Sequence, residues 1–198
     1  MFQRLVRVET REISMGPGKS LAAIVLTVAV ATSGVVGATA GAEPNYLCTD
    51  AAYRAEMLEL HNNFRATHHA PGLQLDEKLN RLAEDWAQRL AATHTFEHRP
   101  DNEFGENLYM MRGNGGAFAG AESAFRAWAD EEEAVYDYNK PGFSMETGHF
   151  TQVVWKATER LGVARACNPE SGETYVVANY DPAGNYEGRF PENVLRPS

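Results

Sequence analysis

Length, composition and charge limit the class of protein that this chain can be. Its 198 residues are 43% hydrophobic and 23% charged, which fits one globular domain with a short extension and excludes a disordered or fibrous protein. The formal net charge of −9 argues against nucleic acid as a partner, because an acidic surface repels phosphate backbones.

The N-terminal segment has the pattern of a secretory signal peptide. Residues 21–41 carry no charge, follow a basic flank and end in small residues, as such peptides do before their cleavage site. We therefore expect residues 1–42 to be removed, with cleavage after Ala40 or Ala42. An uncleaved membrane anchor is the alternative, but the continuous apolar stretch, Leu21–Ala31, is too short to span a bilayer. Cleavage would give a secreted protein without stable membrane insertion, and the loss of four basic and two acidic residues would move its charge from −9 to −11.

Two amphipathic helices are expected after a short lead-in at residues 43–52. Apolar residues recur at helical spacing from Asp50 to Arg65, and Thr49 or Asp50 could cap this first helix. A turn at residues 71–72 separates it from a second, stronger apolar stripe, formed by Leu75, Leu79, Leu82, Ala83, Trp86 and Leu90.

The second half of the chain predicts one more helix and then a sheet. Residues 106–111 are expected to be a short extended segment, and residues 119–133 a third helix. Runs rich in β-branched and aromatic residues predict three strands, at residues 149–155, 161–167 and 175–180. A hairpin loop at residues 169–172 would join the last two. Helices first and an antiparallel sheet later indicate an α+β fold.

The chain has two cysteines, Cys48 and Cys167, and both lie in the part that would be exported. A disulfide persists in that environment, but the sequence does not show whether their Cα atoms come close enough to bridge. The two cysteines could pair, stay free or link two chains.

Two histidines and two acidic residues form a candidate site. Glu106 follows His98 by eight positions, and Glu131 and His149 lie at the ends of predicted elements. Such a set could bind zinc or act as general acid and base. Spacing alone does not bring these side chains together, and histidines in loops are usually solvated.

Two sequence motifs resemble those of the CAP proteins (cysteine-rich secretory, antigen 5, pathogenesis-related). GHFTQVVWKAT at 148–158 matches the first diagnostic motif of this superfamily, and VVANYDPAGNY at 176–186 resembles the second, with Ala178 where many members have Cys. HNNFRATHHAPGLQLD at 61–76 resembles the first-helix region. The resemblance extends over Tyr53–Leu195.

This resemblance implies a three-layer α-β-α sandwich with a central antiparallel sheet over residues 53–198. It also implies a cleft lined by the four residues named above, with His98 and His149 as ligands of zinc or another divalent metal and the carboxylates orienting the rings. Glu132 is the alternative to Glu131, because this chain has one extra residue between Trp128 and the tyrosine that follows it.

Other polar and aromatic residues are expected to be structural. The resemblance implies that His61 and Asn62 pack within the fold, and we expect His68 and His69 to be exposed loop residues. A set of aromatic residues could line a lipid-binding surface, although core packing is commoner for such residues: Phe104, Tyr109, Phe118, Phe125 and Trp128. We expect Trp128 and Trp155 in the core.

Three functions remain open for this chain. The resemblance implies a secreted binding module for sterol or fatty-acid lipids, held in an apolar groove beside or between helices. The alternatives are a metal-dependent hydrolase that uses the cleft, with zinc activating water, and a protein that signals through its surface. We favour the binding module over the enzyme, because no Ser or Cys stands in a motif for covalent catalysis.

Overall fold

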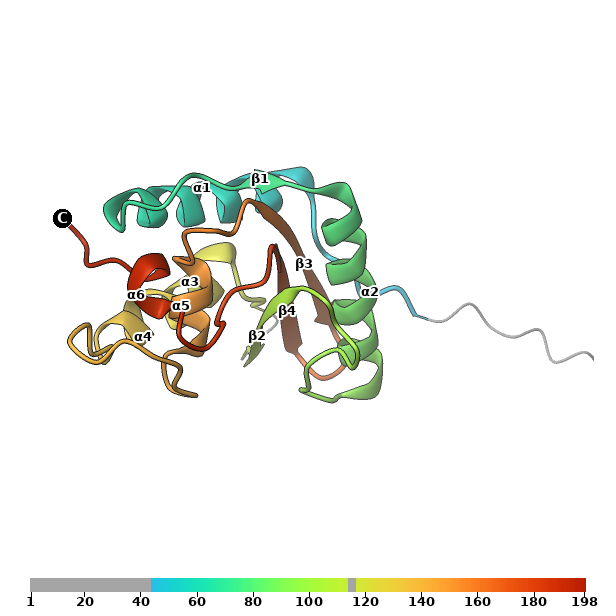
Figure 1. Cartoon of the computed structure of the whole chain (residues 1–198). Helices are drawn as coiled ribbons and strands as arrows, with labels where there is room; N and C mark the ends of the chain where they lie inside the picture. Colours follow the sequence, from blue (N-terminus) through green and yellow to red (C-terminus); the bar gives the residue numbers. More distant parts are fainter. Residues whose placement is uncertain (1–43, 114–116) are drawn as a thin grey trace, which may run out of the picture. The chain divides into compact units, whose positions relative to one another are not determined.

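A four-stranded sheet lies between two groups of helices (Figure 1). The structure, a computed structural model, describes residues 44–113 and 117–198. The strands are β1 (Gln74–Leu75), β2 (Gly105–Arg112), β3 (Arg160–Asn168) and β4 (Glu173–Asp181), in the order β1-β3-β4-β2. The three long strands are antiparallel, as expected, and the two-residue strand β1 adds a parallel edge beside β3.

The helices cover the two faces of the sheet unequally. They are α1 (Ala51–Thr67), α2 (Glu77–Thr93), α3 (Ala121–Trp128), α4 (Asp130–Glu133), α5 (Gly148–Val153) and α6 (Phe190–Asn193). The helix α2 alone covers one face, and α1, α3, α5 and α6 pack on the other (Figure 1). This arrangement is the expected three-layer α-β-α sandwich.

Two hydrophobic cores result from the alternation of side chains along the strands. In β3, Leu161 and Val163 belong to the core beneath α1, α3 and α5, whereas Ala164 and Ala166 belong to the core beneath α2. Successive side chains of a strand point to opposite faces, so a strand buried on both faces must be apolar at nearly every position. This explains the continuous apolar runs in β3 and β4.

Side-chain caps fix where the two long helices begin. The Asp50 carboxylate accepts a hydrogen bond from the backbone N–H of Tyr53 at 2.7 Å, which confirms Asp50 as the cap of α1. The Asp76 carboxylate likewise accepts from the N–H groups of Lys78 and Leu79 at the start of α2. Each cap satisfies donors that have no partner within the first turn.

The prediction of a strand at residues 149–155 is wrong, because residues 149–153 belong to helix α5. Phe150 and Val153 are fully buried one turn apart, and Thr151 and Gln152 between them are buried as well. A short apolar run rich in β-branched residues is compatible with a buried strand or a buried helix. Here packing on all sides outweighs β propensity.

Arg65 holds the end of α5 in place. Its guanidinium is fully buried in α1 and donates to the backbone carbonyls of Val153, Trp155 and Thr158 at 2.8–2.9 Å, and to that of Pro71 at 2.9 Å. Burial lowers its pKa to about 10. The buried charge is therefore solvated by four carbonyl groups, which ties α1 to the segment between α5 and β3.

His61 is a structural residue, as expected. Its ring is fully buried, Nδ1–H donates to the carbonyl of Met57 at 2.7 Å, and Nε2 accepts from the Tyr180 hydroxyl at 2.9 Å. Burial lowers the pKa of His61 to about 4, so the ring stays neutral at ordinary pH. The expectation that His68 is exposed is wrong: the side chain is buried, and its Nδ1 contacts the carbonyl of Leu195 at 2.9 Å.

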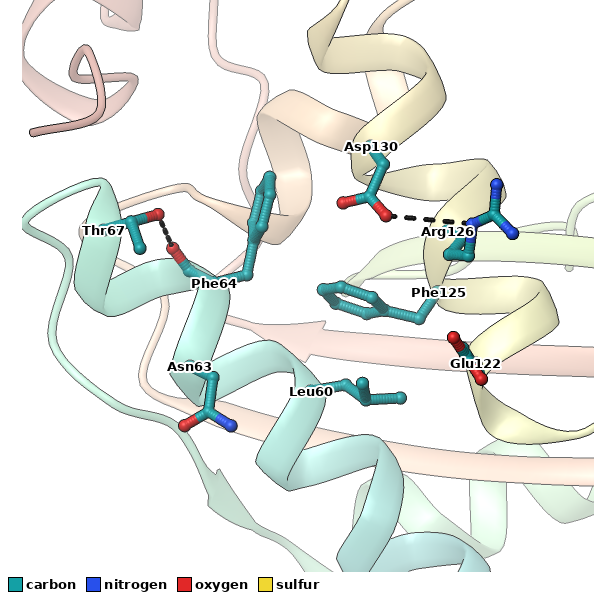
Figure 2. Close-up of a pocket in the computed structure, with 8 residues that line it drawn as sticks. All are labelled: Leu60, Asn63, Phe64, Thr67, Glu122, Phe125, Arg126 and Asp130. Atoms are coloured by element: carbon teal, nitrogen blue, oxygen red, sulfur yellow. Dashed lines mark hydrogen bonds and ion pairs between the residues drawn. The ribbon is translucent and has the colours of Figure 1, made fainter.

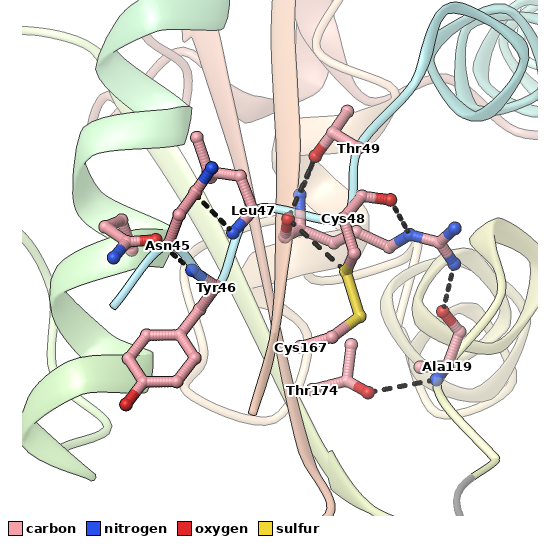
Figure 3. Close-up of a disulfide and its surroundings, with 10 residues drawn as sticks. Asn45, Tyr46, Leu47, Cys48, Thr49, Ala119, Cys167 and Thr174 are labelled. Atoms are coloured by element: carbon pink, nitrogen blue, oxygen red, sulfur yellow. Dashed lines mark hydrogen bonds between the residues drawn. A yellow bond between two sulfur atoms is a disulfide. The ribbon is translucent and has the colours of Figure 1, made fainter. Parts of the chain in front are cut away.

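A disulfide between Cys48 and Cys167 ties the lead-in segment to β3 (Figure 3). Their Cα atoms are 5.8 Å apart, within the usual range for a bridge. The lead-in lies along β3, where Leu47 pairs with Ala166. Arg165 donates to the carbonyl of Cys48 at 3.1 Å. Of the three possibilities for the cysteines, the structure has the intramolecular pair.

The expected signal peptide at residues 1–42 lies outside the residues that the structure describes. Within residues 44–113 and 117–198, no helix has the length and apolar content needed to cross a membrane.

Candidate functional site

His149 is held by the carboxylate of Glu132. It lies in the first turn of α5, where its ring Nδ1 donates to Glu132 Oε1. The other carboxylate oxygen accepts from the backbone N–H groups of His149 and Phe150, at 2.9 and 3.0 Å. Because Thr147 supplies no side-chain cap to α5, Glu132 both caps the helix and orients the imidazole.

The structure therefore selects Glu132 where the sequence left two candidates. Glu131 is exposed. Burial is the larger cause that raises the pKa of Tyr109, and the charge of Glu131 raises it further. Of the two candidates for this position, Glu132 rather than Glu131 contacts His149. The third helix, predicted as one element over residues 119–133, is interrupted here: α3 ends at Trp128, and α4 begins two residues later.

His98 and Glu106 form a second pair of the same kind. The ring Nδ1 of His98 donates to Glu106 Oε1 at 2.7 Å, and the same oxygen accepts from the backbone N–H of Arg99 at 3.0 Å. The hydrogen bond to Glu106 raises the pKa of His98, against the opposing effect of burial. The side chain of Glu106 is 4% exposed and the imidazole of His98 is 64% exposed. The carboxylate is therefore buried, and the ring that it holds is mostly exposed to solvent.

Asparagine side chains connect these two pairs to the sheet. Asn107 follows Glu106 in β2, and its amide donates to the carbonyl of His149 at 3.2 Å. The amide of Asn102 donates to Asn179 Oδ1 at 3.3 Å and lies 3.5 Å from Glu106 Oε2. The main chain of His149 thus lies beside the strand that carries Glu106.

The two histidines have the same hydrogen-bonding arrangement with their carboxylates. In both histidines Nδ1 is engaged by a carboxylate, so Nε2 is the ring atom left for a ligand, which is the orientation that carboxylates impose on metal-binding histidines. Within the part of the chain that the structure describes, however, no group of three or more His, Cys, Asp or Glu residues could hold a metal ion. Two imidazoles alone would leave the other positions of a tetrahedral zinc ion without a protein ligand.

A groove between α1 and α3 is the second candidate site, and the sequence did not locate it. Its volume is about 360 Å³. The residues that line it come from α1, α3 and the start of α4 (Figure 2): Leu60, Asn63, Phe64, Thr67, Glu122, Phe125, Arg126 and Asp130. The rings of Phe64 and Phe125 meet edge to face, 5.7 Å apart, and close the apolar floor of the groove.

The predicted aromatic set divides between the core and the surface. Trp128 and Trp155 are buried, as expected. Phe125 is 5% exposed and belongs to the core, yet it also reaches the groove. The helical spacing of α3 could have predicted that Phe125 faces inward. It could not have predicted the groove that α1 leaves beside this side chain. The groove depends on how two helices pack, which no local pattern encodes.

Comparisons with known proteins agree with this fold. A profile of the cysteine-rich secretory protein family (CAP) matches residues 58–180. The human "Golgi-associated plant pathogenesis-related protein 1" is 39% identical over 153 residues, which cover 73% of this chain and 94% of the relative. "Secreted protein RBT4" of Candida albicans is 34% identical over 173 residues, and the match covers 81% of this chain but only 46% of that relative. Among solved structures, "Crystal structure of NaASP2 with Zn2+" superposes with a TM-score of 0.60 at 27% identity, covering 78% of this chain and 89% of the other.

Proposed function

This chain belongs to the cysteine-rich secretory protein (CAP) family, and we propose that it is a secreted protein that binds a sterol or fatty-acid-type lipid in the groove between α1 and α3. The observation that carries this proposal is the groove itself, with an apolar floor and an open rim. Its residues are supplied by three different helices.

The size and lining of the groove suit one slender lipid. Leu60, Phe64 and Phe125 form an apolar surface, and a volume of about 360 Å³ lies at the lower end of the range for small-molecule sites. Each methylene that leaves water for such a surface stabilises the complex by about 0.8 kcal/mol. Of the two aromatic side chains in the groove, the half-buried Phe64 is the one that a lipid would cover.

Secretion is supported by three features. Residues 1–42 have the pattern of a signal peptide. The disulfide between Cys48 and Cys167 is of a kind that persists in oxidising compartments. One relative is named a secreted protein. We expect the protein recovered from culture medium to begin at Gly41 or Glu43, and N-terminal sequencing measures this; an intact N-terminus in the medium would contradict cleavage.

The lipid proposal is tested by titrating the purified protein with fluorescent sterol and fluorescent fatty acid. Asn63 is exposed on the rim of the groove, so Asn63→Trp should fill the groove without disturbing the core. We expect this variant to lose most of the binding. Ala66→Trp adds the same side chain to an exposed position of α1 outside the lining and should bind as the wild type does. Absence of saturable binding of either lipid would refute the proposal.

A metal ion at His98 and His149 is a second, separate candidate. Both rings are oriented through Nδ1 by a carboxylate, and the related NaASP2 structure is named as containing Zn2+. Calorimetric titration with zinc should show binding to the wild type and a loss of at least tenfold in affinity in His98→Ala and in His149→Ala. His69→Ala is the control, since His69 is exposed and lies outside both pairs. Equal affinity in all four proteins would exclude both residues from a metal site.

A further inference from the structure

We propose that the groove between α1 and α3 discriminates by headgroup charge, and that it accepts a lipid with an uncharged hydroxyl head in preference to one with a carboxylate. This inference rests on the proposed lipid-binding function and narrows it to one class of ligand. It follows from the charged and polar side chains on the rim, which are distinct from the apolar floor.

Three charged residues lie on the rim, spaced four residues apart along α3 and α4. Glu122, Arg126 and Asp130 all line the groove and are all exposed. Arg126 Nε lies 4.0 Å from Asp130 Oδ2, the contact that Figure 2 draws as a dashed line. Among the described residues that line the groove, the one cation is therefore already engaged by an anion, and Glu122 remains outside this ion pair.

A carboxylate headgroup would meet an unfavourable field at this rim. The three side chains sum to one negative charge, and the whole chain carries a formal charge of −9. To pair with Arg126, a lipid carboxylate would have to compete with Asp130. The exposed position of these groups keeps each interaction small, about two- to fivefold in affinity, because water and salt screen surface charges.

A hydroxyl headgroup avoids this repulsion because it carries no charge. Figure 2 shows Glu122 on α3 across from Leu60 on α1, at the edge of the apolar floor. A hydroxyl both donates and accepts. It can therefore donate to the Glu122 carboxylate, whereas a carboxylate can only accept and would face Glu122 as a like charge.

The test compares dodecan-1-ol with dodecanoate, which share one chain and differ in the head. Both are titrated below their aggregation limits, and the ratio of the dodecanoate to the dodecanol dissociation constant is measured. The greater hydrophobicity of the alcohol is common to every variant and cancels when the ratios are compared. We expect Glu122→Gln to lower the ratio about two- to fivefold and Arg126→Gln to raise it. Glu170→Gln, the same charge change in the exposed hairpin between β3 and β4, should leave it unchanged.

Ionic strength provides an independent test of the same electrostatic effect of Glu122. The difference in ratio between the wild type and Glu122→Gln should shrink as ionic strength rises. The inference is overturned if Glu122→Gln gives the ratio of Glu170→Gln, if the wild type binds dodecanoate more tightly than dodecanol, or if neither probe binds. In the last case the sterol titration decides separately whether the proposed function survives.

Discussion

Replacing Glu132 with alanine should destabilise the protein by about 2–3 kcal/mol. The carboxylate accepts hydrogen bonds from two backbone N–H groups at the start of α5 and one from the ring of His149. Loss of a helix cap costs about 1 kcal/mol, and loss of hydrogen bonds to a charged group about 1.5–3 kcal/mol. One side chain makes all three bonds, so the two costs overlap rather than add.

The neighbouring residue provides a matched control. Glu131 is exposed, so Glu131→Ala should change stability by no more than about 0.5 kcal/mol. In a domain of this size 1 kcal/mol shifts the melting temperature by about 2–4 °C, so thermal unfolding followed by circular dichroism should separate the two variants by about 4–10 °C. Equal melting temperatures would refute the assignment of Glu132 as the cap of α5.

Three further predictions concern the core and its cross-links. The double replacement Cys48→Ser and Cys167→Ser should lower the free energy of unfolding by about 2–5 kcal/mol in denaturant unfolding, since the bridge spans 119 positions. The wild type under reductant should show the same loss of stability. An unchanged free energy of unfolding would mean that the bond does not constrain the chain. Arg65→Met should cost about 3–5 kcal/mol, because four buried carbonyls lose their donor; a loss under about 1 kcal/mol would contradict this. His61 has its pKa lowered from 6.5 to about 4, so between these pH values the unfolded chain binds a proton that the folded chain does not, and stability should rise with pH across this window. His61→Gln should flatten that rise in a pH series of urea melts, and an unchanged slope would count against a buried neutral ring.

The elements with strong, unambiguous patterns could be predicted from sequence. The helix α2 carries an apolar stripe on one face, and Ala83, Trp86 and Leu90 of that stripe fill the core beneath it. Leu75, predicted as the start of the stripe, instead lies in β1 and is exposed. Asp50 stands before the first helical turn and caps it. The strands β3 and β4 are joined at the expected hairpin, where Asn168 Oδ1 accepts from the N–H groups of Glu170 and Ser171. In each case local chemistry and tertiary packing favour the same structure.

Prediction failed where tertiary packing decides. The segment of α5 has the composition of a strand, yet it is a helix because Arg65 and Glu132 supply partners for its ends and the core surrounds it. His68 follows helix α1 in a stretch of polar residues, but its side chain contacts the C-terminal segment at Leu195 and is buried. These contacts join residues far apart in sequence, so no local window contains them.

The break between α3 and α4 explains why the site could not be assigned from spacing. In a continuous helix, Glu131 and Glu132 would lie three and four residues after Trp128 and both on its face, so spacing alone does not choose between them. In the structure α3 ends at Trp128, Ala129 has φ −103° and ψ −74°, and α4 begins at Asp130. The register after the break brings Glu132 to the first turn of α5. The same four-residue helix places Asp130 on the rim of the groove, so α4 contributes Asp130 to the proposed lipid site and Glu132 to the support of His149.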